Sequence, residues 1–191
     1  MPMHTRARQA PRHHDEPGIH GKALVPGKGL YMLMVCGIDE AGRGPLAGPV
    51  CAAAVVLGPD FPLELLNDSK KLSQKRREEA RRVICEKALG WEIAWASPAE
   101  IDQINILRAS LLAMKRAFDA LALRCEGLGF GGFSDIVVDG TFCPEIGGPV
   151  RALVKADALV PEVMAASILA KTARDRMMER WDWIYPGYGY A

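Results

Sequence analysis

The chain is poor in histidine, and the histidines it has lie at one end. All four fall within the first 20 of the 191 residues. The rest of the chain therefore offers no histidine for a Ser-His-Asp or Cys-His catalytic arrangement, and none for a zinc site. Acid–base or metal chemistry beyond residue 20 must use carboxylates, lysines or tyrosines.

Cysteine motifs and long hydrophobic runs are also missing. The five cysteines are odd in number and widely spaced, without a Cys-x-x-Cys pair, which favours buried thiols in a reducing cytoplasm. No run approaches the roughly 18–20 consecutive apolar residues of a membrane-spanning helix. With 49% hydrophobic and 25% charged residues, the composition is that of one globular domain.

Neither sign of charge dominates, because 24 Lys and Arg stand against 23 Asp and Glu. Residues 1–28 hold five of the basic residues and two of the acidic ones, so the remainder has a slight acidic excess. Such a body needs a local basic patch or bridging metal ions to bind nucleic acid. We expect 1–30 to be a disordered basic tail, or a stretch upstream of a start at Met32 or Met34, and 31–191 to form the folded domain.

Hydrophobic patterning predicts strands and helices that interleave without an internal repeat. Strands are expected at 31–38, 50–57, 91–96, 135–138 and 150–154. Helices are expected at 73–89, about 104–124 and 162–183, and a capping box at Ser97 and Glu100 marks a further helix start. This order predicts an α/β fold with a central sheet.

Four acidic residues follow short apolar strands. Asp39 and Glu40 come after the first strand, Asp139 after the fourth and Asp157 after the last. If these strands are neighbours, the carboxylates converge at one edge, which is costly unless divalent cations bind there. Oxygen-only ligands suit Mg²⁺ or Mn²⁺ rather than zinc, and two such ions about 3.5–4 Å apart catalyse phosphoryl transfer in nucleases and polymerases.

The glycine-rich turn after Asp39 and Glu40 has weaker interpretations. Its glycines at 37 and 42 have P-loop spacing, but Arg43-Gly44 replaces the required Lys-Ser/Thr. Residues 42–47 fit a loose dinucleotide fingerprint, but the following prolines lead into a strand rather than a helix. Taken alone, the acidic pair could also be a solvated strand end.

A basic element precedes the helix expected at 73–89. Lys70 and Lys71 lie before its N-terminus, where free N–H groups favour anions. Beside an acidic metal cluster, the two lysines suggest contacts to phosphate. In isolation, a solvated basic turn is the simpler interpretation.

Taken together, these motifs resemble ribonuclease HII. The residues occur in the order of that family: GIDEAGRGPLAG at 37–48, DSKKLS at 68–73, INIL at 104–107, VDG at 138–140, KAD at 155–157, and AASILAK at 165–171 followed by Arg174-Asp175. The resemblance implies an RNase H-like fold, a central mixed β-sheet flanked by helices. It also implies an endonuclease that cleaves the RNA strand of RNA–DNA hybrids and incises at ribonucleotides embedded in duplex DNA.

The resemblance further implies a role for each motif. Asp39, Glu40, Asp139 and Asp157 would be catalytic and would bind two Mg²⁺ or Mn²⁺ ions, which activate a water and stabilise the leaving 3′-oxygen. The products would carry 3′-hydroxyl and 5′-phosphate ends. The ribose 2′-OH would be sensed largely by backbone, at Gly42, Arg43 and Gly44. Positions near the substrate backbone would be Lys70, Lys71, Asn105, Ser167 and Lys171. Helix packing of Ser167 and an ion pair of Lys171 with Asp175 are the alternatives.

The end of the sequence departs from the family pattern. Family members continue past residues 185–190 through a His-Lys-Gly-Tyr segment, whose tyrosine packs against the ribose at the RNA–DNA junction. The 191 residues stop before it, so a catalytically impaired, hybrid-binding fragment is the alternative function. Another RNase H-like nuclease or recombinase is less favoured, because DSKKLS and AASILAK occur together. We expect a cytoplasmic monomer without membrane association.

Overall fold

The computed structural model describes residues 34–66 and 72–190. The tail expected at 1–30 lies outside them. The elements in chain order are β1 (Met34–Ala41), β2 (Val50–Val56), η1 (Leu63–Leu65), α1 (Gln74–Lys87), β3 (Gly90–Ala96), α2 (Pro98–Gly127), β4 (Phe133–Asp139), β5 (Val150–Leu153), η2 (Ala156–Ala158) and α3 (Pro161–Ile184). Within this part of the chain, no helix combines the length and apolarity needed to cross a membrane.

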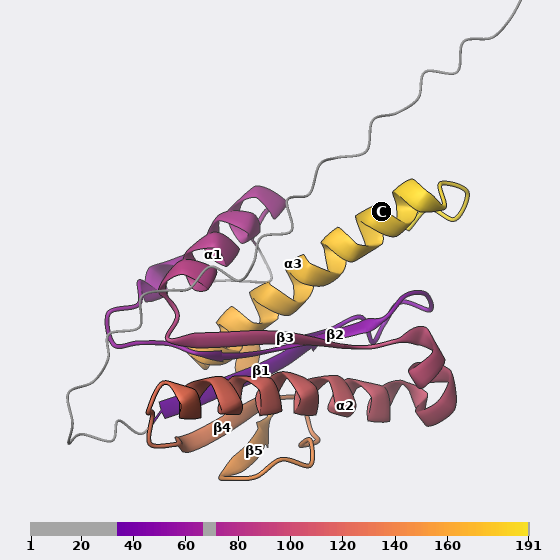
Figure 1. The fold of residues 1–191 in the computed structure, drawn as a ribbon. Coiled ribbons are helices and arrows are strands. Elements are labelled where there is room, and N and C mark those ends of the chain that lie inside the picture. Colours follow the sequence, from indigo (N-terminus) through magenta and orange to yellow (C-terminus); the bar gives the residue numbers. More distant parts are fainter. Residues whose placement is uncertain (1–33, 67–71, 191) are drawn as a thin grey trace, which may run out of the picture.

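The strands form one mixed sheet in the order β3-β2-β1-β4-β5 (Figure 1). β1 pairs with β2 and β2 with β3 in antiparallel fashion, while β1–β4 and β4–β5 are parallel. Helices cover both faces, so the expected α/β fold with a central mixed sheet is confirmed. β1 lies in the middle and joins the antiparallel half of the sheet to the parallel half.

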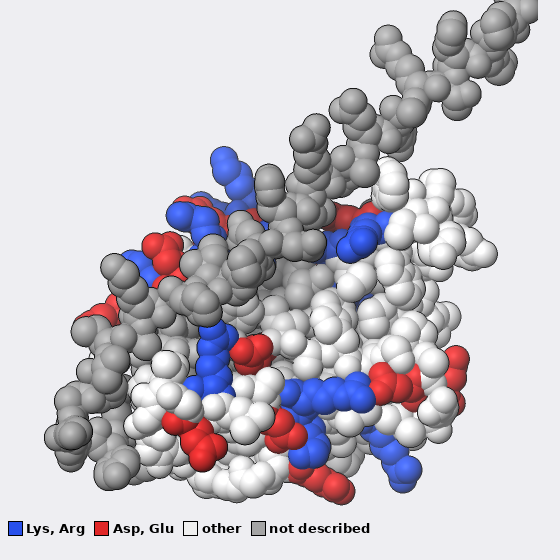
Figure 2. Space-filling model, in the orientation of Figure 1, with Lys and Arg blue, Asp and Glu red and all other residues white. Residues whose placement is uncertain are grey.

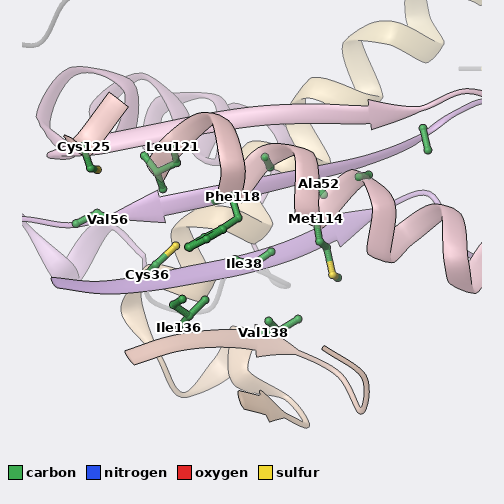
Figure 3. Packing of buried hydrophobic residues seen from close by; sticks show 14 of the residues in the cluster. Cys36, Ile38, Ala52, Val56, Met114, Phe118, Leu121, Cys125, Ile136 and Val138 are labelled. Atoms are coloured by element: carbon green, nitrogen blue, oxygen red, sulfur yellow. The ribbon is translucent and has the colours of Figure 1, made fainter. Parts of the chain in front are cut away.

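Among the helices of the described residues, α2 is the one that packs against the first face of the sheet. The apolar core on this side joins alternate residues of β1, such as Cys36 and Ile38, to Met114, Phe118 and Leu121 of the helix (Figure 3). α2 starts with the expected capping box, in which Ser97 and Glu100 satisfy each other's backbone N–H groups. The helix therefore buries one continuous apolar stripe against the sheet.

The opposite face packs against α1 and α3. Every residue of β2 is buried, because its alternate side chains point into the two cores. α3 contributes small and branched residues to this second core, including Ala165, Ala166 and Leu169. The small side chains let the helix axis lie close to the sheet.

The seam between α1 and α3 is polar. α1 buries only Ala80 and Ile84. Charged pairs join it to α3, with Arg176 donating to both carboxylate oxygens of Glu78 at 3.2 and 2.6 Å, and Arg77 lying 3.5 Å from Asp175. α1 is thus attached by a small apolar contact and several exposed or half-buried charges.

The start of one helix differs from the sequence-based expectation. The capping box and the helix expected at about 104–124 belong to one element, α2, which is interrupted at Asn105 by non-helical backbone angles (φ 67°, ψ 164°). Apolar residues recur at helical spacing on both sides of the break, so the hydrophobic pattern alone does not locate it. The start of the helix expected at 73–89 is confirmed: Ser73 caps α1, and its side chain accepts from the N–H of Arg76 at 3.4 Å.

The first turn of α3 lies directly on β1. A Cβ atom added to Gly37 would lie 2.2 Å from the backbone C of Glu162 and 2.2 Å from the backbone N of Val163. No side chain fits between two backbones at that separation. Gly37 therefore fixes how closely the start of α3 approaches the central strand.

We predict that Gly37→Ala lowers the free energy of unfolding by about 2–4 kcal/mol, because the methyl group must push α3 away from the sheet. Chemical denaturation measures this difference. Gly127→Ala is the matched control: its Cβ would meet nothing within 4 Å, and alanine gains up to about 1 kcal/mol of helix propensity. Equal stability of the two variants would contradict the close approach.

Candidate active site

Asp39 and Asp139 lie side by side at the carboxyl ends of two parallel strands. The register pairs Ile38 of β1 with Val138 of β4, so the next residue on each strand is the aspartate. Asp39, Glu40 and Asp139 were all expected just past the ends of their strands. The expected strand ends were wrong, because β1 extends to Ala41 and β4 includes Asp139. β1 continues to Ala41 because it stays paired with β2.

Asp157 reaches the same edge through a tight turn after β5. Lys155 adopts a left-handed conformation (φ 61°, ψ 32°), and the chain then forms the single turn η2, in which Asp157 is buried. The N–H of Ala156 donates to Asp139 Oδ1 at 2.7 Å. This hydrogen bond ties the turn to the end of β4 and orients the Asp139 carboxylate.

Three of the four expected carboxylates form a compact group. Asp39, Asp139 and Asp157 each offer an oxygen, and these oxygens lie within 4.8 Å of one another. Glu40 is outside this group. It lies beside it, with Oε1 accepting from Arg43 Nη1 at 3.2 Å and only 12% of its side chain exposed.

Burial, together with neighbouring negative charge, raises the pKa of two carboxyl groups of this site. Burial, followed by the charge of Glu40, holds the pKa of Asp39 well above its ordinary value, and Asp139 adds to this rise. The hydroxyl of Ser167 donates to Asp39 and opposes the shift. Burial also raises the pKa of Glu40, while Arg43 opposes that rise.

The residues present fit a hard divalent cation. Every donor is a carboxylate oxygen, which suits Mg²⁺ or Mn²⁺ and not zinc. Glu40 Oε2 is buried and has no hydrogen-bond partner among the described residues. A buried acceptor of this kind, beside three clustered carboxylates, is what a cation would satisfy.

A pocket of about 380 Å³ opens beside the carboxylates, between the end of β1 and helices α1 and α3. It is lined by Glu40, Ala41, Gly42, Pro45, Arg77, Ser167, Ile168, Lys171 and Arg174. Ser167 and Lys171, both expected near the substrate, therefore lie at this pocket. Lys171 also pairs with Asp175 at 2.5 Å, so the ion pair considered as its alternative is present.

The loop of residues 42–49, which we call the GRG loop, links β1 to β2 at the same edge. Its residues 43–47 are exposed, and a Cβ atom on Gly44 would meet nothing within 4 Å. Gly42 lies at the pocket and Arg43 beside Glu40. Lys70 and Lys71 lie outside the described residues.

Asn105 has a structural role that its sequence context does not reveal. It is exposed, and its Oδ1 accepts from the N–H of Arg108 at 3.1 Å. It thereby caps the second segment of α2 after the break. With φ 67° and ψ 164°, Asn105 lies outside the left-handed helical region that asparagine tolerates, so the break is a strained backbone position.

Two positively charged pocket residues were not among the sequence-based candidates. Arg77 lies within the helix expected at 73–89 and was not singled out there, and Arg174 was named only as part of the Arg-Asp pair after AASILAK. A charged residue on a helix is usually solvated, so neither was distinguishable by type. The usable signal for Arg174 is its position seven residues after Ser167, which places both on one helix face.

Comparison with known proteins agrees with this geometry. The sequence model of the family described as "Ribonuclease HII" matches residues 36–190. A protein named ribonuclease HII from Treponema denticola is 58% identical over 165 residues, covering 82% of this chain and 83% of that protein. The chain belongs to the ribonuclease HII family.

Solved structures share the fold. The Archaeoglobus fulgidus RNase HII, solved in complex with PCNA, is 32% identical with a TM-score of 0.65, covering 82% of this chain and 80% of that one. The ribonuclease H2 of Pyrococcus horikoshii OT3 is 27% identical with a TM-score of 0.69, covering 82% and 79%. As a ribonuclease HII, the chain is a nuclease of the ribonuclease H class, which acts on RNA–DNA hybrids.

Charge on the described surface is mixed. On the face shown in Figure 2, Lys and Arg side chains alternate with Asp and Glu, and neither sign covers a continuous area of the described residues. The basic side chains at the pocket are therefore distinguished from the other basic residues by their position and not by their number. They lie next to the carboxylates, where a phosphate backbone would need them.

We predict that Asp39 makes the metal-free protein less stable as pH rises. The folded state holds a proton on this group at pH values where the unfolded chain, with an ordinary pKa of 3.8, has released it. Stability therefore falls as pH rises from this value through the raised native pKa. In EDTA, Asp39→Asn should melt close to the wild type near pH 4 and several degrees above it at pH 8.

Thermal melts over a pH series measure this difference, and subtracting the variant from the wild type removes the contributions of groups that do not interact with Asp39. A melting-temperature difference that is independent of pH would contradict the raised pKa. A difference of opposite sign would mean that Asp39 is stabilised as a carboxylate.

Proposed function

We propose that this ribonuclease HII cleaves RNA–DNA hybrids and incises at single ribonucleotides in duplex DNA by two-metal-ion hydrolysis, leaving 3′-hydroxyl and 5′-phosphate ends. The observation that supports it most is the convergence of Asp39, Asp139 and Asp157 at one sheet edge, with the buried Glu40 beside them. The family is dependent on divalent metal ions. Within the proposal, these ions are Mg²⁺ or Mn²⁺.

In this proposal, Asp39, Glu40, Asp139 and Asp157 hold the cations. Two bound ions would lower the pKa of the attacking water and would offset the negative charge on the leaving 3′-oxygen. Ser167 keeps the Asp39 carboxylate oriented, and the N–H of Ala156 does the same for Asp139. Histidine is not required, in keeping with its absence beyond residue 20.

Recognition of the ribose is assigned to Gly42, Arg43 and Gly44. The GRG loop is exposed next to Glu40, and the open space at Gly44 leaves its backbone accessible to a sugar. Ser167 and Lys171 border the adjoining pocket, where a substrate phosphate would meet Lys171 and Arg77. A 2′-OH is what distinguishes RNA from DNA at such a contact.

Lys70, Lys71 and Asn105 remain candidates for contacts to the substrate backbone. The two lysines precede α1, whose residue Arg77 lines the pocket. The five free thiols suit a reducing compartment, and we include a cytoplasmic location and a monomeric state in the proposal.

We predict that Asp139→Asn keeps the fold and lowers kcat/KM on a hybrid duplex by at least about 100-fold, because a neutral amide is a poor ligand for a hard dication. Its side-chain oxygen can still accept from Ala156, so the turn survives. Asp135→Asn is the matched control, since Asp135 lies on the same strand and pairs with Arg151. It should cleave like the wild type.

Cleavage assays with Mg²⁺ and with Mn²⁺, and melting temperatures with and without each ion, separate the possible outcomes. The wild type should melt higher with metal, and Asp139→Asn should lose most of that rise. Wild-type turnover in Asp139→Asn would contradict the carboxylate site. Hybrid binding by the wild type without cleavage would instead favour the non-catalytic alternative.

We predict that Gly44→Ala changes the free energy of unfolding by less than about 0.5 kcal/mol, since its methyl group would point into open space. The same methyl group would lie where the ribose approaches. It should therefore lower kcat/KM on a duplex with a single ribonucleotide by about tenfold or more. Gly127→Ala is the control, and equal kinetics of the two variants would remove Gly44 from the ribose contact.

A further inference from the structure

The GRG loop contains no regular secondary structure, yet the proposed function requires its backbone to lie at a set distance from Asp39 and Glu40. Residues 43–47 are exposed, and Leu46 at the tip is fully so. The tip itself therefore makes little contact with the body of the protein. What holds the loop must act at its base.

Arg174 of α3 binds the base of the loop. Its side chain is buried, with 8% of the residue exposed. Nη2 donates to the carbonyl oxygen of Ala47 at 2.9 Å, and Nε donates to that of Pro49 at 3.3 Å. Hydrogen bonds from a charged donor are stronger than those between neutral groups, so this fork fixes two carbonyls of the returning limb.

The outgoing limb of the loop packs against the same side chain. Gly42 has a positive φ of 112°, and a Cβ atom there would lie 2.5 Å from Arg174 Nε. Gly48, with φ 90°, approaches Met178 one turn further along α3. Both limbs of the loop thus rest on one face of the helix, and Arg174 fills the space between them.

Arg174 also differs from the other cations at the pocket. Lys171 and Arg77 both pair with Asp175. Among the described residues, no carboxylate forms an ion pair with Arg174, whose recorded acceptors are the two loop carbonyls. Its hydrogen-bonding capacity is therefore directed at the loop rather than at a neighbouring side chain.

We propose that Arg174 is a positioning residue for ribose recognition, which holds the GRG loop so that residues 42–44 face the sugar beside the carboxylates. This inference rests on the proposed function, because it assigns a purpose to the loop that Arg174 holds. Lysine cannot replace it fully, since one ammonium group cannot reproduce the planar fork that meets two carbonyls.

The test compares Arg174→Met and Arg174→Lys with Arg176→Met in the full chain. Arg176 lies on the same helix and loses a bidentate ion pair with Glu78 on substitution, but it does not contact the loop. Three quantities are measured: hydrogen exchange of the backbone amides in 42–48, the melting temperature with and without Mn²⁺, and kcat and KM on two substrates. The substrates are a long RNA–DNA hybrid and a duplex with one ribonucleotide.

Arg174→Met should exchange faster in 42–48 than Arg176→Met, and its kcat/KM should fall by about ten- to a hundred-fold, more on the single-ribonucleotide duplex. The rise in melting temperature with Mn²⁺ should remain, because the carboxylates are untouched. Arg176→Met should stay within about threefold of the wild type. Arg174→Lys, which keeps the charge and most of the side-chain volume, should give intermediate values and serves if the methionine variant does not fold.

Unchanged exchange in the loop and wild-type kinetics in a folded Arg174 variant would overturn the proposal. If Arg174 had only a structural role, its substitution would lower the melting temperature. At assay temperatures well below that melting temperature, kcat/KM would then be unchanged. Wild-type protein that cleaves neither substrate would contradict the proposed function. The exchange measurement would still decide, independently of activity, whether Arg174 holds the loop.

Discussion

The close approach of α3 to the central strand governs the rest of this structure. At Gly37 the backbones of β1 and α3 are so near that no side chain fits between them. From that point the helix and the strand run in the same direction. Eleven residues of helix and five residues of strand each advance about 16 Å, so the contact between Gly37 and Val163 is followed in step by that between Gly42 and Arg174. Ser167 falls between them, beside Asp39. One face of one helix thus supports a carboxylate of the proposed metal site and the neighbouring loop.

The second constraint is electrostatic. Three carboxylates whose oxygens lie within 4.8 Å of one another repel, and the fold offsets this only in part. The N–H of Ala156, the Ser167 hydroxyl and the Arg43 guanidinium each contact one acidic group. The pKa of Asp39 nevertheless stays raised. Without a cation, the site therefore relieves part of this repulsion by holding a proton on Asp39, and a divalent cation that binds there would displace that proton.

Much of this architecture could be predicted from sequence, and the parts that could not depend on contacts distant along the chain. Apolar runs located the strands, and Ser73 and the Ser97–Glu100 box located two helix starts. Local sequence does not specify which strands are neighbours, so the convergence of Asp39 with Asp139 could be predicted only by assuming that their strands pair. The parallel pairing of β1 with β4 confirms that assumption. The break at Asn105 was missed because apolar periodicity continues across it. Arg174 was missed because its acceptors lie about 125 residues earlier, on backbone that sequence patterns do not describe.

Because the seam between α1 and α3 is polar, α1 is held less firmly to the rest of the fold than α2 is. α2 is held by a broad apolar layer, whereas α1 buries only Ala80 and Ile84. Local opening of α1 therefore requires less free energy than global unfolding, and salt lowers it further by screening the ion pairs with α3. Because Arg77 of α1 lines the pocket, one wall of the proposed substrate site shares this salt sensitivity. If the phosphate backbone binds in this pocket as proposed, ionic strength acts on nucleic-acid binding twice: it screens the phosphates, and it weakens the attachment of α1, which carries one wall of the pocket.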